Sequence, residues 1–481
     1  MPDLDRRGRL VVLAICCCSL FVVGMDVTIV NLALPAIGRD LDAGFSGLQW
    51  TIDAYTLVLA SLLMLAGSTA DRVGRRKVFQ IGLVLFGAGS LLCSLAPDTG
   101  SLIAFRALQA IGGSMLNPVA MSIITNTFTD RRERAAAIGV WGAVIGLSMA
   151  LGPLIGGILV DGVGWRSIFW VNVPVVVVAA LLAARFVPES RAAHPRRLDP
   201  VGQVLVMVLL GSVTFGIIES PTHGLVSPLI IGMAVLALAA GTALVRYERR
   251  HPEPLIDLRF FASAPFTGAT VIAVAAFAAL AGFLFLSALY LQEVRGFSAL
   301  HAGLLTLPMA AMTVVLPPIS GRLVGSRGTR LPLLLGGAGI AGSGAMLIGL
   351  TATTPLWYLI TAFVLFGVGF GFVNAPITTS AVSGMPMSRA GVASAVASTS
   401  RQVGSTLGVA VLGALVTATI VGPVATGFVD AARVSWIVMC GCGLLVVVLA
   451  LVTTGRWARG TAERVAVLFD DDVPAPVATA R

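Results

Sequence analysis

The chain has 481 residues, of which 57% are hydrophobic and only 11% are charged, and its formal net charge is +9 at pH 7. Ordinary soluble domains carry about a quarter charged residues, so this composition excludes a soluble globular protein. All six cysteines lie in long apolar stretches, which excludes the disulfide framework of a small secreted domain (Cys16, Cys17, Cys18, Cys93, Cys440 and Cys442).

Apolar stretches of the ~20 residues needed to cross a bilayer recur along the whole chain. We expect fourteen membrane-spanning helices, at 10–36, 48–70, 78–96, 101–125, 136–160, 166–186, 200–218, 225–246, 265–291, 299–320, 331–351, 355–378, 393–421 and 432–454. The first stretch is too long for a cleaved signal peptide. The tail over 456–481 contains three consecutive aspartates and Pro-Ala-Pro, and we expect it to be disordered.

The basic residues are distributed unevenly between the two sides of the predicted bundle. With the N terminus inside, the outer turns hold only Arg39, Arg166, Arg295 and Arg433. Lys and Arg are retained on the cytoplasmic side of membranes, so we expect a multi-pass protein of the cytoplasmic (inner) cell membrane with both termini in the cytoplasm. The positive charge then reflects orientation and does not require a nucleic acid partner.

A short turn between the second and third spans holds five charges. Its sequence is Gly67-Ser-Thr-Ala-Asp71-Arg72-Val-Gly74-Arg75-Arg76-Lys77, which resembles the signature loop between helices two and three of major facilitator superfamily transporters. Asp71 can pair with basic residues of the inner turns when the cytoplasmic side closes and must release them when it opens, which predicts a gate. The alternative is a plain topology anchor.

A second copy of this pattern predicts an internal repeat. Gly321-Arg-Leu-Val-Gly325 lies at the end of the tenth span, as the Gly67 motif lies at the end of the second, and Gly325 stands where the first copy has Asp71. We therefore expect an N-terminal six-helix bundle at 1–190, an inserted two-helix linker at 191–264 and a C-terminal six-helix bundle at 265–455. Such parallel repeats resemble the all-α major facilitator fold, whose substrate site lies between the halves. The resemblance also implies a functional monomer.

Charges inside the spans are costly, so each is a candidate functional group. Asp26 lies ~24 Å up the outward-running first helix, at ~1.5 Å per residue, and Arg106 lies ~8 Å below the outer surface on the fourth. Asp53 on the second helix comes out at a similar level, so one carboxylate can pair with Arg106 while the other binds a proton. In general, a carboxyl group takes up a proton more readily when buried and less readily beside an arginine.

Structural alternatives remain open for these three residues. Asp26 can be an acid permanently bonded to a neighbouring helix, Asp53 can be hydrated near the outer surface, and Arg106 can be a fixed clamp. Because arginine stays charged, Arg106 cannot itself carry the proton. We take Asp26 as the preferred proton carrier and Arg106 as the charge that modulates it.

Further motifs resemble one branch of this superfamily, the fourteen-span drug:proton antiporters. The resembling segments are Met25-Asp26-Val-Thr28-Ile-Val-Asn31-Leu-Ala-Leu34-Pro35, Trp50-Thr-Ile-Asp53-Ala54-Tyr55, Phe105-Arg106-Ala-Leu-Gln109-Ala-Ile-Gly112-Gly113, Gly146-Leu-Ser-Met-Ala-Leu-Gly152-Pro153-Leu-Ile-Gly156-Gly157 and Ser400-Arg401-Gln402-Val-Gly404. The resemblance implies a proton-coupling role for Asp26 and Arg106. Small residues in the fifth helix permit close packing and Pro153 permits a kink, which suits a rocking interface between the halves; simple helix packing is the alternative.

The energy source follows from what the sequence lacks. Its single lysine, Lys77, follows Arg76 and not glycine, so there is no Gly-Lys-Ser/Thr phosphate loop. The histidines have no metal-ligand spacing, and no nucleophile, base and orienting group occur together, so we expect neither a metal, nor a cofactor, nor an enzyme. A proton gradient is the expected energy source.

We therefore expect an exporter of amphipathic or cationic small molecules that exchanges them for protons by alternating access. Aromatic and polar side chains of the spans are the expected substrate pathway: Asn31, Trp50, Tyr55, Gln109, Phe277, Phe283 and Phe285. The alternatives are a dedicated exporter of one metabolite or self-made antibiotic and, in a different class, a membrane sensor or scaffold.

Overall fold

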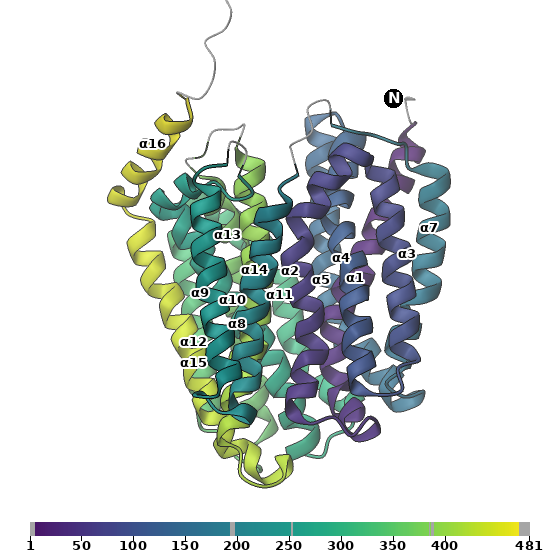
Figure 1. The fold of residues 1–481 in the computed structure, drawn as a ribbon, viewed down its shortest axis with the longest axis vertical. Helices are drawn as coiled ribbons and strands as arrows, with labels where there is room; N and C mark the ends of the chain where they lie inside the picture. Colours follow the sequence, from purple (N-terminus) through teal and green to yellow (C-terminus); the bar gives the residue numbers. More distant parts are fainter. Residues whose placement is uncertain (1–4, 193–197, 252–253, 384, 386–388, 471–481) are drawn as a thin grey trace, which may run out of the picture.

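The structure is a computed structural model that describes residues 5–192, 198–251, 254–383, 385 and 389–470. In these ranges it contains helices and no strand, and 14 of the helices are long and apolar enough to cross a membrane. The expected all-α polytopic fold is therefore confirmed. The long helices run roughly parallel to one another in one bundle (Figure 1).

The N-terminal part of the bundle contains seven helical elements. They are α1 (Arg6–Asp40), α2 (Phe45–Val73), α3 (Arg75–Ser94), α4 (Thr99–Thr127), α5 (Arg131–Gly162), α6 (Ser167–Trp170) and α7 (Asn172–Phe186). Side-chain caps explain where two of these helices begin. Asp5 accepts from the backbone nitrogen of Gly8 at the start of α1, and Asp98 forms a capping box with Ser101 at the start of α4. The expected sixth span is divided into α6 and α7 by a single turn residue, Val171.

Two further helices, α8 (Pro200–His223) and α9 (Pro228–Glu248), follow. Gln203 Nε2 of α8 donates to the backbone oxygen of Ser61 on α2, and Trp50 Nε1 of α2 donates to Glu219 Oε1 of α8 over 2.8 Å. Most side chains of α9 are exposed, as expected for a helix that faces lipid. These contacts attach α8 to α2, while the boundaries of the inserted linker stay a prediction.

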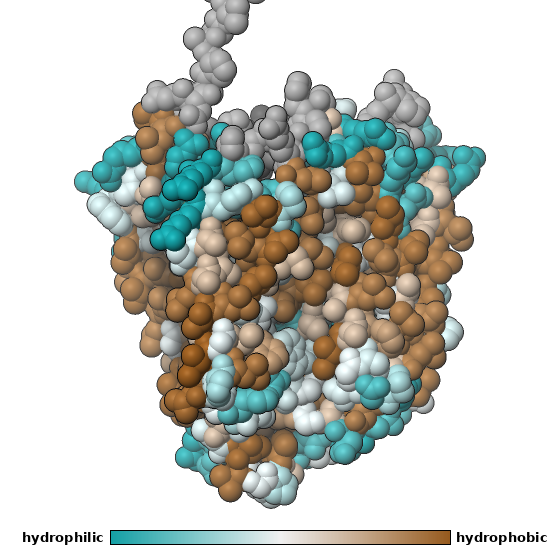
Figure 2. All heavy atoms as spheres, in the orientation of Figure 1, coloured by the Kyte–Doolittle hydropathy of each residue, from teal (hydrophilic) through white to brown (hydrophobic). Residues whose placement is uncertain are grey.

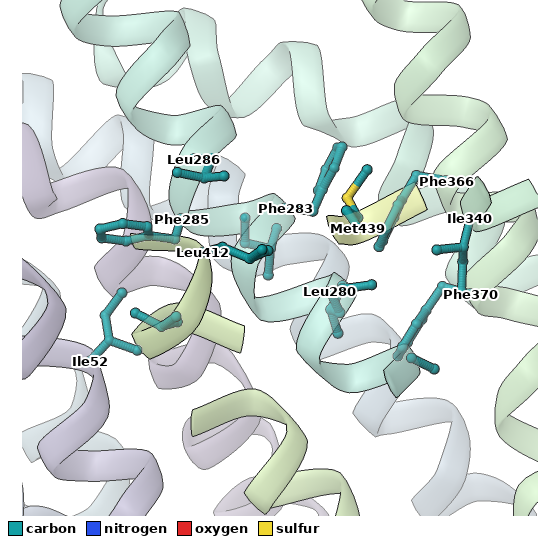
Figure 3. Close-up of a cluster of buried hydrophobic side chains, with 14 of the residues drawn as sticks. Ile52, Leu280, Phe283, Phe285, Leu286, Ile340, Phe366, Phe370, Leu412 and Met439 are labelled. Atoms are coloured by element: carbon teal, nitrogen blue, oxygen red, sulfur yellow. The ribbon is translucent and has the colours of Figure 1, made fainter. Parts of the chain in front are cut away.

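The C-terminal part comprises η1 (Leu258–Ala262), α10 (Ala264–Leu289), the π-helix η2 (Tyr290–Val294), α11 (Ala299–Arg327), α12 (Arg330–Ile348), α13 (Leu356–Val382), α14 (Ala390–Thr419) and α15 (Val424–Thr453). Its core is aromatic. Phe283 of α10 stacks on Phe366 of α13, with ring centroids 4.3 Å apart, and Phe285 points the other way, toward α2 (Figure 3). The two faces of α10 therefore serve different contacts.

The expectation of a disordered tail is wrong over residues 456–470, which form α16 (Arg456–Asp470). Ala458, Ala462, Val465 and Phe469 recur every three or four residues and are buried, so the segment has one apolar helical face. The Phe469 ring packs on Phe260, with centroids 5.2 Å apart. This apolar face packs the segment against η1. Two of the three aspartates that suggested disorder, and the Pro-Ala-Pro segment, lie within residues 471–481, outside the described residues.

The surface shows a broad apolar belt with hydrophilic residues gathered at both ends of the bundle (Figure 2). The belt is what a bilayer requires of the helices that face it. Helix α16 and the N terminus lie at the same end of the molecule (Figure 1). We call this the N-terminal end of the bundle and the opposite one the distal end.

Contacts between the N-terminal helices α1–α7 and the C-terminal helices α10–α15 gather at the distal end. Arg39 Nη1 lies 2.8 Å from Glu293 Oε1, and Gln49 Nε2 donates to the backbone oxygen of Val409 over 3.1 Å. Asp161, near the end of α5, caps the start of α11 by accepting from the backbone nitrogens of Ala299 and Leu300 over 3.1 and 2.8 Å.

The same two helices have open space toward the N-terminal end. A Cβ added to Gly157 of α5 would lie 2.5 Å from Leu300 Cα, whereas one added to Gly139 or Gly142 would meet nothing within 4 Å. Added Cβ atoms on Gly321 and Gly325 of α11 also meet nothing. The two groups of helices are therefore joined at the distal end.

Candidate functional site

A buried ion pair joins two of the three charges singled out from the sequence. Arg106 Nη1 of α4 lies 2.6 Å from Asp26 Oδ2 of α1, and the two side chains are 1% and 0% exposed. The expected pairing of Arg106 with one carboxylate is thus found for Asp26. Pairs removed from water this completely need further hydrogen bonds to offset the cost of desolvation.

Amide side chains of α4 and α7 supply those bonds. Gln109 Nε2 of α4 and Asn172 Nδ2 at the start of α7 both donate to Asp26 Oδ1, over 2.9 and 3.1 Å. Gln109 also bonds Ser90 Oγ of α3 and accepts from Arg106 Nη1 over 2.6 Å. Asp26 is therefore held by groups of α4 and α7 within the N-terminal part of the molecule.

Sequence analysis missed Ser90 and Asn172, and it placed Gln109 in the substrate pathway. The signal for Asn172 was available, because an amide within an apolar span costs free energy unless it is bonded. Gln109 has no exposed surface and bonds the ion pair, so in this conformation it does not line an open path.

Arg106 also connects the pair to α2. Its Nε donates to the backbone oxygen of Thr51 over 3.1 Å, and its guanidinium carbon lies 4.2 Å from the centre of the Tyr55 ring. A cation over an aromatic face is attracted to it, more strongly when water is excluded. Tyr55 is thus a neighbour of the ion pair, and its hydroxyl oxygen is buried without a hydrogen-bond partner.

Asp53, also on α2, has a different environment. It is fully buried, and its Oδ2 has no hydrogen-bond partner. Thr56 Oγ1 donates to Asp53 Oδ1 over 3.3 Å and accepts from Thr406 Oγ1 of α14 over 3.0 Å. No basic side chain within 4 Å pairs with Asp53 in the described parts of the chain. The Thr56 hydroxyl therefore links the Asp53 carboxyl group to the contact between α2 and α14. The alternative of a hydrated Asp53 does not fit its burial.

The glycines of the fifth-span motif lie at two interfaces of α5. Added Cβ atoms would collide with Thr28 Oγ1 at Gly152 and lie 2.6 Å from Ile29 Cγ1 at Gly156, both on α1. At Gly157 the collision is with α11, and Gly146 lies in ordinary contact with Val314 of the same helix. Helix α5, which contains Pro153, is thus wedged between α1 and α11.

The charged loop after α2 is arranged around two carboxylates. Arg75 Nη2 lies 2.8 Å from Asp71 Oδ1, and Glu189, just after α7, accepts from the backbone nitrogens of Arg76 and Lys77 at the start of α3. In this conformation Asp71 pairs within its own motif, and no ion pair joins it to a C-terminal helix in the described ranges. Its gating role stays a prediction.

Gly74 makes the sharp turn between α2 and α3. Its φ of 127° lies in a region that side chains disfavour, and an added Cβ would lie 2.7 Å from Glu189 Oε1. Gly67 stands close to Pro118 of α4, and Arg72 is exposed. The turn therefore requires glycine at position 74.

The aromatic residues expected to line the pathway do not share one site. Trp50 packs on Phe215 of α8, Phe283 lies in the core between α10 and α13, and Phe285 packs edge-on against Phe45 of α2 at the distal end. Only Phe277 lies beside an unpaired charge, its ring centre 5.9 Å from the Arg401 guanidinium carbon. The other three are parts of helix packing in this conformation.

A cavity of about 10 Å³ lies between α1, α5, α10 and α11 at the distal end. Asn31 lines it with Thr28, Pro153 and Thr306, and Asn31 Oδ1 has no partner. The volume is about that of one water molecule. This cavity cannot hold a drug-sized molecule.

Comparisons with known proteins agree on one family. The family described as Major Facilitator Superfamily matches residues 16–409. The chain is 36% identical over 418 residues to the multidrug resistance protein Stp of Mycobacterium tuberculosis. The aligned residues cover 86% of this chain and 77% of Stp. The chain is 35% identical to the methylenomycin A resistance protein of Streptomyces coelicolor, over 82% of this chain and 83% of that one.

A solved structure has the same fold. It is a bacterial homolog of the human lysosomal transporter Spinster in an inward-facing, unoccupied conformation, with a TM-score of 0.64 over 98% of this chain and 100% of that chain. At 18% identity, the likeness concerns the fold alone.

Proposed function

Because this chain belongs to the major facilitator superfamily, we propose that it is a proton-coupled antiporter that exports amphipathic or cationic drugs and antibiotics by alternating access. Relatives named for multidrug and antibiotic resistance support export as its activity. The proton gradient supplies the energy, without a cofactor, and one copy of the chain is the transporting unit.

The positive-inside rule places the N terminus and α16 in the cytoplasm of a cell whose plasma membrane the bundle crosses. The distal end then faces outward. Since the two groups of helices are joined there through Arg39 and Glu293 and through Asp161 and α11, this conformation is the inward-facing one, in which substrate enters from the cytoplasm.

Asp53 is the group that we assign to carry the proton, and its burial beside the contact between α2 and α14 is the observation that supports the mechanism most. An ionised carboxylate without a cation is costly to bury, so the protonated form fits this environment. Loss of the proton to the cytoplasm leaves a charge that needs water, and water reaches it when Thr56 and Thr406 separate. Deprotonation therefore favours the outward-facing state.

Asp26 was the proton carrier preferred from the sequence, and its contacts favour a different role in this conformation. Its carboxylate is held in place by hydrogen bonds from Arg106 and Gln109 of α4 and from Asn172 of α7. We assign to the Asp26 and Arg106 pair the task of fixing α1 against α4, so that α2 moves with them. In this proposal Asp53 carries the proton and Asp26 has a structural role, whereas the sequence left open which of the two acids binds the proton.

Transport by purified protein in lipid vesicles tests this function. Vesicles with an imposed pH gradient should move ethidium against its concentration gradient with the wild type. The Asp53→Asn protein should fail to do so while remaining folded. Gradient-driven transport by Asp53→Asn at the wild-type rate would refute the assignment of Asp53, and absence of any gradient-driven transport by the wild type, across a chemically varied compound set, would refute the function.

A narrow exporter of one antibiotic is the second candidate. The relative named for resistance to methylenomycin A favours it. A resistance panel in a sensitive host distinguishes the two: a multidrug exporter raises the tolerated concentration of several unrelated compounds, whereas a dedicated one raises it for a single chemical class.

A further inference from the structure

Arg401 is a membrane-embedded charge that the mechanism above does not use. It lies in the first half of α14 and is half-buried. Its Nη2 donates to Thr378 Oγ1 of α13, and its Nε is buried with no hydrogen-bond partner. A charged side chain at this position is costly unless it is paired or hydrated, and such residues mark substrate or ion pathways.

The C-terminal helices have no acid to pair with Arg401. Between residues 264 and 454 the sequence contains only two acidic residues, Glu293 and Asp430. Both lie at the distal end, where Glu293 pairs with Arg39 and Asp430 lies 3.1 Å from Arg433. The contrast with Arg106, which has Asp26 at 2.6 Å, shows that Arg401 is not one half of a structural ion pair.

The position of Arg401 along α14 places it beside the entrance from the cytoplasm. Thr406, which contacts Thr56 across the two halves, is five residues farther toward the distal end, or ~7.5 Å along the helix axis. Arg401 therefore lies on the N-terminal side of this contact, the side toward which α5 and α11 have open space.

A hydroxyl and an aromatic ring lie beside the guanidinium of Arg401. Phe277 of α10 lies 5.9 Å from it. On α13, Asn374 is four residues before Thr378, so both lie on the same helix face, and the half-buried Asn374 side chain makes no hydrogen bond to another described residue. An arginine fork, an amide, a hydroxyl and a ring are suited to an acidic group attached to an apolar body.

We propose that Arg401 binds the carboxylate of amphipathic acids, so that the substrates of this exporter include acidic molecules as well as cations. The inference rests on the proposed export function and names a substrate class for it. Nε and the outer guanidinium nitrogens donate to the carboxylate oxygens, while the apolar body lies against Phe277. Asp53 lies on α2, in the other half of the molecule, and binds the proton and not the carboxylate of the substrate.

Binding of two fluorescent probes to purified protein tests the proposal. Pyrenebutyrate and pyrenebutanol share the apolar body and differ in the carboxylate. A hydrogen bond to a charged group predicts that the wild type binds pyrenebutyrate about tenfold more tightly than pyrenebutanol. Arg401→Gln should abolish this preference and leave pyrenebutanol binding unchanged, and Arg401→Lys should keep part of it. Arg433→Gln, which removes an exposed arginine of the distal end, should keep all of it.

Several results would overturn the proposal. They are equal binding of both probes by the wild type, no binding of pyrenebutyrate, and equal weakening of both probes by Arg401→Gln, which would show a structural role. Arg401→Lys tests the same point if the glutamine variant does not fold. Gradient-driven ethidium transport by the wild type is measured in parallel. If the wild type transports ethidium but shows no preference for pyrenebutyrate, the role of Arg401 is refuted and the export function stands. If the wild type prefers pyrenebutyrate but transports no ethidium, the export function is refuted and carboxylate binding by Arg401 stands.

Discussion

Asp26 and Arg106 lie 80 positions apart in the sequence, yet their side chains form an ion pair of 2.6 Å that water does not reach. Removing one partner of such a pair leaves an unpaired buried charge and costs about 3–5 kcal/mol in soluble proteins.

We expect Arg106→Gln to lower the thermal unfolding temperature of the purified protein clearly and to abolish transport. In the double variant Asp26→Asn with Arg106→Gln, both charges are gone, so part of the lost stability should return while transport stays absent. A single Arg106→Gln variant as stable as the wild type would show that the pair contributes little.

Asp53→Asn mimics a permanently protonated carboxyl group. We expect this variant to lose transport driven by a pH gradient and to exchange labelled for unlabelled ethidium across vesicles only slowly, because the outward-facing state is then reached without the help of deprotonation. The matched control is Glu219→Gln, which removes an acid of α8 bonded to Trp50 and should leave the pH-driven rate within about twofold. Retained pH-driven transport in Asp53→Asn would contradict the assignment.

Gly157 permits α5 to approach α11 at the distal end. We expect Gly157→Val to prevent this approach, because its side chain would collide with Leu300, and so to shift the protein toward the outward-facing state. Spin labels at Val163 and Val421, both highly exposed, should report a longer distance in this variant. Gly139→Val adds the same side chain where an added Cβ meets nothing and should leave the distance unchanged; a matching increase there would argue against a specific contact.

Gly74 should not tolerate a side chain. Its φ of 127° and the nearby Glu189 predict that Gly74→Ala lowers the free energy of unfolding by about 1–3 kcal/mol, the typical cost of a disfavoured backbone conformation. Thermal unfolding measures the effect, with Gly139→Ala as the unstrained control. An unchanged unfolding temperature in Gly74→Ala would mean that the turn relaxes freely.

Much of the fold could be predicted because a bilayer imposes helix length and apolar composition on each span. Matching depths also brought Asp26 and Arg106 to one level before their contact was known. Sequence spacing gives the relative directions of side chains on one helix, so it could place Gln109 on the same face of its helix as Arg106. It does not say which neighbouring helix each face meets, so it could not show that Phe283 faces the core of the C-terminal helices.

Other features depend on tertiary partners. The contact of Thr56 with Thr406 joins two ordinary threonines from distant helices, and no local pattern marks it. Helix α16 was missed because disorder was inferred for the whole tail from the aspartates and prolines at and beyond the end of this helix, and the apolar face of residues 456–470 was not considered. Arg401 was noticed only within a motif, and its lack of an acidic partner emerged when its neighbours were placed around it.

In the proposed mechanism, substrate leaves in exchange for a proton carried by Asp53. The most direct test follows both movements in the same vesicles, with pyranine reporting internal pH and ethidium fluorescence reporting substrate. An ethidium gradient is imposed and a pH gradient is not. Ethidium flowing down its own gradient should drive protons the opposite way with the wild type and should drive none with Asp53→Asn. Ethidium flux without proton movement in the wild type, or equal proton movement in both proteins, would contradict this mechanism.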